Sequence, residues 1–280
     1  MNQNRVLRLY PSPQGECTLE GLYLDHPMGH PDSDAAPFVY TNFVSSLDGR
    51  IAVENPRAGR RSAPPAITNP RDWRLFQELA ARADALIVSA AFVRGLAEGR
   101  SHEKLPVGQD AAFSDLHEWR RERGMPPQPA IVILSRSLDV AVAERCQSLE
   151  RAVYFAVGSD VALDHRAAVE ATGARILIAG NGRQVEGRAL IDALGHEGFR
   201  RIYSIAGPRV LHTLLKGGVL HRLYLTHFHR LLGGPSFDTL LEGDPLEPPA
   251  SFVLRSIHFD RGLEGAAGQF FAAYDIARGA

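Results

Sequence analysis

The sequence predicts an α/β fold with a mostly parallel sheet, because strand and helix patterns alternate through its C-terminal half. The periodicity gives strands at residues 175–179, 201–205 and 220–228, with helices between them at 188–196 and 208–216. A strand–helix–strand order joins parallel neighbours through right-handed crossovers and covers the sheet with helices. The last two strand patterns, at 251–259 and 269–277, have no helix between them. They are therefore expected to form an antiparallel hairpin at one edge of the sheet.

The first half of the chain contributes further elements to this sheet. Its strand patterns lie at residues 38–44, 85–88, 131–134 and 152–157. A helix is expected to begin at Asn69, which can cap it, with Pro70 in the first helical position. Residues 113–123 predict a solvated helix. Residues 1–36 are expected to form an irregular arm, with a short edge strand at 21–24, ahead of a single domain over 37–280.

Composition narrows the functional classes. The chain has 280 residues, a formal net charge of −1 and 22% charged residues, so no charge excess favours nucleic acid or an anionic membrane. The cysteines, Cys17 and Cys146, are far apart and outside any motif, which argues against a disulfide scaffold and for a reducing compartment. We therefore expect a cytoplasmic protein with a small-molecule substrate and no nucleic-acid or membrane partner.

Small and polar residues follow several predicted strands, where open α/β sheets bind their ligands. The segments are 45–49, 89–93, 135–137 and 206–209. Gly207 and Pro208 lead into a helix whose N-terminus offers free N–H groups to a phosphate, although a tight turn alone also explains them. Ser135 and Arg136 suit a phosphate monoester such as the 2′-phosphate of NADP, or they are a solvated loop.

Two other patterns carry weaker signals. Asp48 precedes Gly49, and such a pair is usually a turn, although the carboxylate is a candidate catalytic group. His227 and His229 lie on one face of a strand and could begin a metal site, but no third ligand has a recognisable spacing. No metal is therefore expected, and a metal hydrolase remains the remote alternative. The absence of a G-x-G-x-x-G run argues against an ordinary Rossmann site.

Several motifs, in order, resemble the riboflavin-biosynthesis reductase family, the C-terminal domain of the bacterial bifunctional deaminase-reductase. Residues 42–52, NFVSSLDGRIA, resemble its opening strand and loop. Further similarity lies in the ITNP helix start at 67–70, the strand at 82–88, the Ser-Arg turn at 135–136, the loop at 206–211 and the strand and Leu-Leu-Gly end at 218–233. The match covers roughly residues 38–275.

The resemblance implies a dihydrofolate-reductase-like three-layer α/β/α fold, NADPH as hydride donor and a homodimer. It places Ser46 and Asp48 at the reacting centre as catalytic residues, and Asn42 with Ser46 beside the substrate. It also assigns a larger set to the cofactor: Thr68, Asp72, Ser89, Ser135, Arg136, Ala206, Gly207, Pro208, Arg209, Val210 and Leu211. A buried carboxylate at Asp48 is expected to stabilise a developing iminium or position a proton donor.

The substrate half departs from the family pattern. Ile205 stands where the family has an acidic residue, and Ala66 replaces a tryptophan. Trp73 and Ala80 replace arginines that serve the substrate. The leading hypothesis is therefore an NADPH-dependent reductase of a riboflavin precursor or of another small carbonyl, imine or pterin-like compound. The alternative is an NADP-binding protein without turnover.

Overall fold

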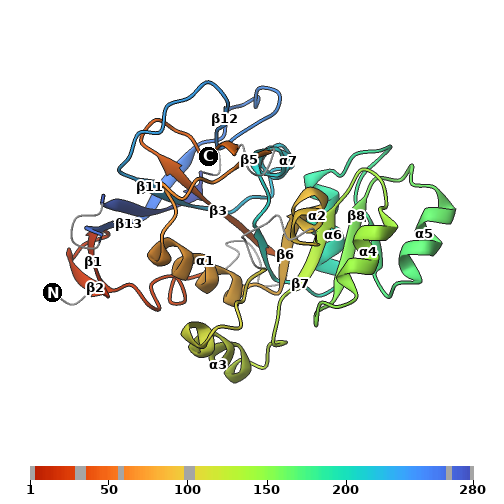
Figure 1. Ribbon diagram of the computed structural model, residues 1–280, viewed down its shortest axis with the longest axis horizontal. Coiled ribbons are helices and arrows are strands. Elements are labelled where there is room, and N and C mark those ends of the chain that lie inside the picture. Colours follow the sequence, from red (N-terminus) through yellow and green to blue (C-terminus); the bar gives the residue numbers. More distant parts are fainter. Residues whose placement is uncertain (1–3, 29–35, 56–59, 98–104, 263–266, 278–280) are drawn as a thin grey trace.

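The computed structural model describes residues 4–28, 36–55, 60–97, 105–262 and 267–277, and eleven strands in these ranges form one sheet (Figure 1). Its parallel part runs, in spatial order, through β11 (Arg222–Phe228), β3 (Phe38–Ser46), β10 (Arg201–Ser204), β6 (Ala85–Ser89), β7 (Ala130–Leu134), β8 (Val153–Val157) and β9 (Arg175–Ile178). Next to β11 follow the antiparallel strands β14 (Gln269–Ile276), β13 (Phe252–Asp260), β1 (Arg5–Tyr10) and β2 (Gly15–Thr18). The predicted mostly parallel α/β sheet is confirmed.

Helices cover both faces of the sheet and make three layers (Figure 1). One core contains apolar side chains of α1 (Pro70–Arg82), α2 (Ala90–Ala97), α3 (Ser114–Glu122), α4 (Val140–Cys146) and α5 (Leu163–Glu170). The other core contains those of α6 (Gly187–His196) and α7 (Pro208–Lys216). A short 3-10 turn, Ala111–Phe113, precedes α3, and a small sheet joins β12 (Phe237–Asp238), β4 (Ala52–Asn55) and β5 (Arg60–Ser62). In the described ranges, no helix is both long enough and apolar enough to span a bilayer.

The N-terminal segment differs from the expected irregular arm. Its strands β1 and β2 extend the sheet beyond β13, so the C-terminal hairpin is antiparallel as predicted but does not form the edge. Residues 21–24, expected as an edge strand, form turns instead. The strand signal in β1 was missed because Arg5 and Arg8 bracket the short apolar pair Val6 and Leu7, of which Val6 faces the core. Only the pairing with β13 reveals the strand.

The expected solvated helix at 113–123 is α3, but one of its charged side chains is buried. The guanidinium of Arg120 is fully buried and donates to the carbonyl oxygens of Ala81 (2.7 Å) and Ala83 (2.8 Å) at the end of α1. These carbonyls have no partner within a helix. Arg120 therefore joins α3 to α1, which a solvated helix would not do.

The start of α1 is fixed by a buried hydrogen-bond network. Asn69 caps the helix as predicted, because its side chain accepts from the backbone N–H groups of Arg71 and Asp72. Its amide also donates to Gln269 on β14 (2.9 Å). Asp260 on β13, only 1% exposed, accepts from Gln269 (2.8 Å) and from Arg71 (2.7 Å). The antiparallel strands therefore hold the first turn of α1 in place against the sheet.

We predict that Asp260→Ala destabilises the fold strongly, because it leaves Arg71 and Gln269 without their shared acceptor. Removing one partner of a buried ion pair costs about 3 kcal/mol of unfolding free energy. Urea denaturation measures this, with the exposed Glu144→Ala on α4 as the control, expected to change stability by less than about 0.5 kcal/mol. Equal stability of the two variants would contradict the proposed role of the network.

Candidate active site

The residues predicted at strand ends gather along one edge of the sheet. Strands β3, β10, β6 and β7 are parallel neighbours in that order. Their carboxyl ends therefore place Ser46, Ala206, Ser89 and Ser135 in a row. This edge is where open α/β sheets bind ligands.

The N-terminus of α7 has the features of a phosphate site. Gly207 is exposed, and a Cβ added there would meet no atom within 4 Å. No side chain caps the helix, Pro208 has no N–H group, and the Val210 N–H donates to the carbonyl of Gly207 (3.0 Å). The backbone N–H of Arg209 is therefore the one in the first turn that is left for an anion. The other residues predicted in this loop differ in burial. Ala206 and Leu211 are buried in the core, and Pro208 and Val210 are half-buried. Arg209 is exposed and forms an ion pair with Glu242 (2.5 Å). Gly207 is the member of this loop best placed to approach a ligand.

The remaining predicted cofactor residues differ in how free their side chains are. The Ser89 hydroxyl accepts from the backbone N–H of Phe92 (3.1 Å) at the start of α2. The Ser135 hydroxyl donates to the carbonyl oxygen of Ser137. Arg136 is exposed, and within the described residues its guanidinium has no hydrogen-bond or ion-pair partner. Thr68 is exposed and donates weakly to the carbonyl of Pro64 (3.5 Å). Arg136 thus brings a free cation to the edge.

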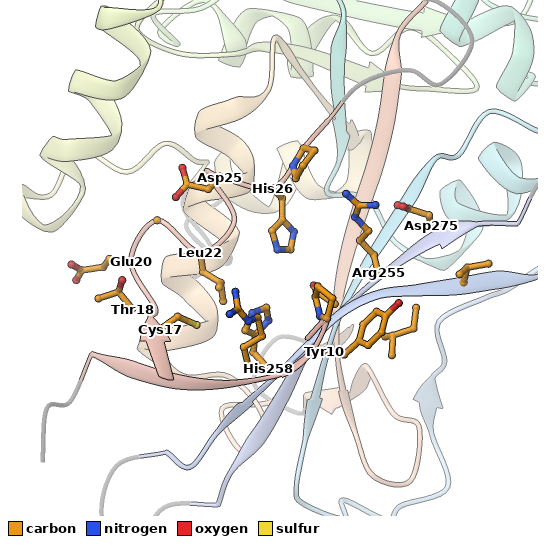
Figure 2. A pocket seen from close by; sticks show the side chains of 17 residues that line it. Tyr10, Cys17, Thr18, Glu20, Leu22, Asp25, His26, Arg255, His258 and Asp275 are labelled. Atoms are coloured by element: carbon orange, nitrogen blue, oxygen red, sulfur yellow. The ribbon is translucent and has the colours of Figure 1, made fainter. Parts of the chain in front are cut away.

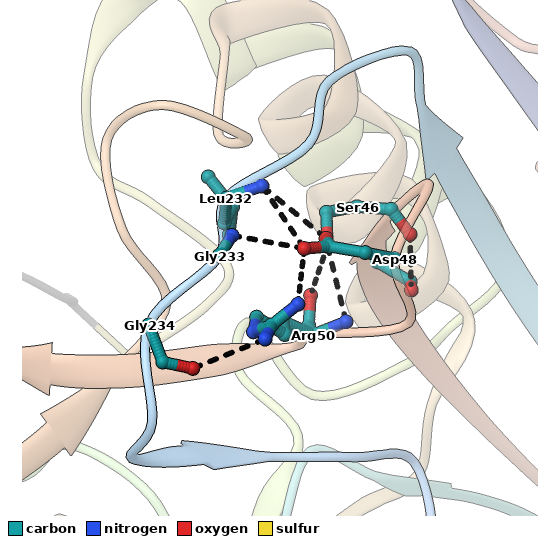
Figure 3. Close-up of polar contacts among 7 residues, drawn as sticks. Ser46, Asp48, Arg50, Leu232, Gly233 and Gly234 are labelled. Carbon is teal, nitrogen blue, oxygen red and sulfur yellow. Dashed lines mark hydrogen bonds and ion pairs between the residues drawn. The ribbon is translucent and has the colours of Figure 1, made fainter.

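Asp48 holds two loops together (Figure 3). One of its carboxylate oxygens accepts from the Ser46 hydroxyl (2.5 Å), and the other accepts from the Arg50 guanidinium and the backbone N–H of Gly233 (2.9 Å). The backbone N–H of Leu232 adds a longer contact of 3.2 Å. The turn after β3 is therefore fastened to the loop after β11.

These contacts determine the charge of Asp48. Hydrogen bonds from Ser46 and from the backbone of Gly233 hold the pKa of the Asp48 carboxyl well below its ordinary value. Its side chain is 21% exposed, so the expected buried carboxylate is not at this position. A carboxylate that stays ionised is a poor proton donor, and the geometry supports a positioning role for Asp48.

Asp72 at the start of α1, which the resemblance assigns to the cofactor, is a carboxyl with the opposite behaviour. Asp72 accepts from the hydroxyl of Thr226 on β11 (2.6 Å), which lowers its pKa, but burial outweighs this and raises the pKa of Asp72 to about 6. The residue is still partly exposed. A carboxyl with such a pKa exchanges protons near neutral pH, as a general acid or base must.

Polar and aromatic side chains lie on the same face of the sheet as this carboxyl. Asn42, predicted beside the substrate, accepts from the Tyr203 hydroxyl (2.5 Å). On α1, Phe76 lies 5.9 Å from the Tyr203 ring and stacks on Trp73 at 4.9 Å. Trp73 and Phe76 are half-exposed, so the face offers flat apolar surface beside a proton-exchanging carboxyl. Such a combination fits a planar heterocycle.

Sequence reasoning missed Thr226 and Tyr203. Both belong to the face shared by Tyr40 and Asn42, because strand alternation and the registers of β11 and β10 against β3 put them there. No local motif marks either residue, and only the sheet register would have found them.

His227 lies on β11 and His229 directly after it, where the His229 ring packs against neighbouring strands. The His229 ring lies 4.7 Å from that of Phe270 and 5.9 Å from that of Phe259, and His227 is half-buried. Among the described residues, no three or more His, Cys, Asp or Glu side chains cluster as metal ligands would. No contact in the described structure supports the metal hydrolase alternative.

Comparison with known proteins identifies the family. Residues 37–260, more than half of the chain, match the RibD C-terminal domain family. The chain belongs to the RibD C-terminal domain family. The resemblance drawn from residues 42–52 and the later motifs is confirmed, and with it membership of a reductase family.

Individual relatives agree with this assignment of the RibD C-terminal domain family. The chain is 26% identical over 208 residues to the 2,5-diamino-6-ribosylamino-4(3H)-pyrimidinone 5′-phosphate reductase of Archaeoglobus fulgidus, covering 74% of this chain and 87% of the relative. A pyrimidine reductase-like protein from Corynebacterium diphtheriae has the same fold, with a TM-score of 0.68, 20% identity and coverage of 94% of this chain and 100% of that one. Acinetobacter baumannii RibD superposes with a TM-score of 0.58 and 18% identity over 87% of this chain and 58% of its own. The dihydrofolate-reductase-like α/β fold expected from the resemblance is confirmed.

We predict that Asp48→Asn lowers the melting temperature at neutral pH, because Arg50 and Ser46 lose an anionic acceptor. A carboxyl with a depressed pKa stabilises the fold fully above its unfolded value, here 3.8, and loses that contribution as the pH falls towards its folded value. The difference from the wild type should therefore stay constant from about pH 7 to about pH 5 and shrink as the pH falls below about 4 in thermal melts. Asp164→Asn, on the exposed start of α5, is the control. A difference that stays constant with pH would contradict the charge-based explanation.

Proposed function

We propose that this protein is an NADPH-dependent reductase that reduces a C=N or C=O bond of a small substrate with a planar nitrogen heterocycle. The observation that carries the proposal is the Asp72–Thr226 pair beside Asn42, Trp73 and Phe76. The family assignment and the activity in the name of the Archaeoglobus fulgidus relative support it. A ribosylaminopyrimidine of riboflavin biosynthesis is the first substrate to test.

The edge residues fit a phosphorylated dinucleotide. The uncapped N-terminus of α7 beside the exposed Gly207 would hold a phosphate, and the free guanidinium of Arg136 would pair with another. When bound, NADPH supplies the hydride. Asp48 keeps the turn after β3 and the loop after β11 in fixed positions beside it.

Asp72 would exchange the proton that accompanies hydride transfer. Its carboxyl holds a proton below about pH 6 and accepts one hydrogen bond from Thr226, which orients it. It can donate that proton to a nitrogen or oxygen of the substrate, or accept a hydrogen bond from a ring N–H once ionised. Asn42 would hold a polar edge of the same ring, while Trp73 and Phe76 exclude water from its face.

One residue favours a second candidate function, an NADP-binding protein without turnover. Ile205 is half-exposed next to Ala206, where the family resemblance leads us to expect an acidic substrate contact. An isoleucine cannot hydrogen-bond the substrate. Oxidation of NADPH with the pyrimidinone phosphate named for the Archaeoglobus fulgidus relative would exclude this second candidate. NADPH binding without oxidation by this compound and by a panel of ribosylaminopyrimidines and pterins would favour it.

Cofactor binding gives the first prediction of this proposal. Fluorescence titration should show saturable NADPH binding that is tighter than NADH binding, because only NADPH carries the extra phosphate. Arg136→Ala should weaken NADPH binding about tenfold and leave the affinity for NADH nearly unchanged, as expected for loss of one charge-assisted contact. Arg145→Ala, an exposed arginine on α4, is the matched control. Equal affinities for both nucleotides would contradict the role of Arg136, and no binding of either would remove both candidate functions.

The protonation of Asp72 gives the second prediction. Carbon-13 NMR of the aspartate carboxyls should show one group titrating near pH 6, and Thr226→Val should raise that pKa further by removing a hydrogen bond that lowers it. A folded pKa above the unfolded 3.8 means that folding stability declines as the pH rises from about 4 to about 6, and Asp72→Asn should abolish this decline. If the proton is used in reduction, kcat/KM falls above about pH 6. A carboxyl that titrates at its ordinary value would refute the assignment.

A further inference from the structure

A cavity of about 630 Å³ lies away from the candidate active site, among the antiparallel strands (Figure 2). Its lining comes from β1, β2 and β13 and from residues 20–22 and 25–27. The cavity reaches Asp275, near the end of β14. In the sheet, Asp275 is paired with Arg222 at the start of β11. Its volume is in the range of small-molecule sites.

Buried polar atoms in this cavity have no partner. Ser256 and His258 are only 4% and 3% exposed, and within the described structure the Ser256 hydroxyl and the His258 Nδ1 make no hydrogen bond. His26, which also lines the cavity, has an unpartnered Nδ1 as well. Buried polar groups in proteins are nearly always satisfied, because an unmade hydrogen bond costs free energy. Several such atoms around one cavity leave hydrogen-bonding groups that a polar ligand can satisfy.

The backbone is also distorted at this position. The register of β13 shifts between Leu254 and Ser256, and that of β1 shifts between Arg8 and Tyr10. Bulges of this kind redirect side chains and occur beside functional sites. Here both bulges belong to the strands that line the cavity.

Cationic groups surround the two imidazoles. Arg8 is the register partner of His258, and Arg255 is exposed without a hydrogen-bond or ion-pair partner in the described residues. Burial lowers the pKa of His26 to about 3, helped by Arg222, His258, Arg82 and Arg255. Burial, with Arg8, lowers the pKa of His258 to about 4. Both rings are therefore neutral near pH 7, in a field that favours an anion.

The carboxylates of the cavity do not cancel this field. The Asp275 carboxylate forms a bidentate ion pair with Arg222 (2.5 and 3.2 Å) and is therefore neutralised. Glu20 and Asp25 are exposed, and Figure 2 shows them on the opposite side of the cavity from Arg255. An oxyanion is thus favoured near Arg255 and the Ser256 hydroxyl, with a hydroxyl or N–H group of the ligand directed at the acceptor Nδ1 of His258.

We propose that this cavity is a second binding site, for a hydroxylated organic acid or phosphate monoester. The guanidinium groups of Arg8 and Arg255 receive the oxyanion, and the Ser256 hydroxyl donates to it. The His258 Nδ1 accepts from a hydroxyl or N–H group of the ligand, since its neutral ring already bonds to the backbone of Phe271. The oxyanion is the shared chemistry, and the probes below distinguish carboxylate from phosphate.

Calorimetric titration of the full chain with gluconate and with glucose 6-phosphate tests the site, with glucose and inorganic phosphate as probes that lack one half of the chemistry. We expect saturable binding of at least one acid or ester and clearly weaker binding of glucose and of inorganic phosphate. Saturating NADPH should leave the affinity unchanged. Nitrogen-15 NMR of the histidines should show a shift of the His258 Nδ1 signal.

Two variants locate the binding. Arg255→Gln and Ser256→Ala should each lower the affinity for the probe about tenfold, which is the usual effect of losing a hydrogen bond to a charged group. Ser256→Ala removes a hydroxyl without a protein partner, so its melting temperature should not fall. Arg145→Gln, on α4, is the control and should bind as the wild type does.

Other outcomes overturn the proposal. Absence of saturable binding at millimolar probe would mean that solvent alone fills the cavity. Binding that NADPH displaces, or that both variants retain, would place the probe elsewhere. Equal binding of inorganic phosphate would reduce the site to an ion site without a place for an organic ligand.

Discussion

The hydrogen-bond network at Asp260 is the constraint on which the candidate site depends. It ties the first turn of α1 to β13 and β14 through Arg71, Gln269 and Asn69. Asp72 is the next residue after Arg71, so its carboxyl can meet Thr226 only while this turn stays in place. Because β14 pairs with β11, the network and Thr226 belong to one continuous part of the sheet.

Within that frame, two carboxyls of one site have opposite proton affinities. Asp48 receives hydrogen bonds that favour its ionised form, whereas Asp72 is buried with a single hydroxyl donor. Environment alone separates their pKa values, since both are aspartates. Such a separation commonly marks the division between a group that exchanges a proton and one that keeps its charge. The site therefore contains one proton-exchanging group, at the start of α1, and one positioning group, in the turn after β3.

Local chemistry explains how much of this the sequence could predict. The cap at Asn69 and the small residues after β10 depend on neighbouring residues, so the pattern of the chain showed them. The Asp48 contacts to Gly233 and the Asp72 contact to Thr226 join residues about 150 or more positions apart. Strands β1 and β2 likewise need β13 to exist as strands. These long-range contacts depend on how the strands are aligned in the sheet. That alignment cannot be read from local patterns in a single sequence.

A row of packed rings separates the candidate active site from the proposed second site. It runs from His26 through Tyr224, Tyr40 and Tyr203 to Phe76, with centroids between 4.9 and 6.3 Å apart. The three tyrosines in it are essentially fully buried, and close-packed interiors resist continuous deformation. Coupling between two sites requires an element with two arrangements, and fully buried, close-packed rings leave little space for a second one. The two ligands should therefore bind independently, at opposite ends of this row of rings.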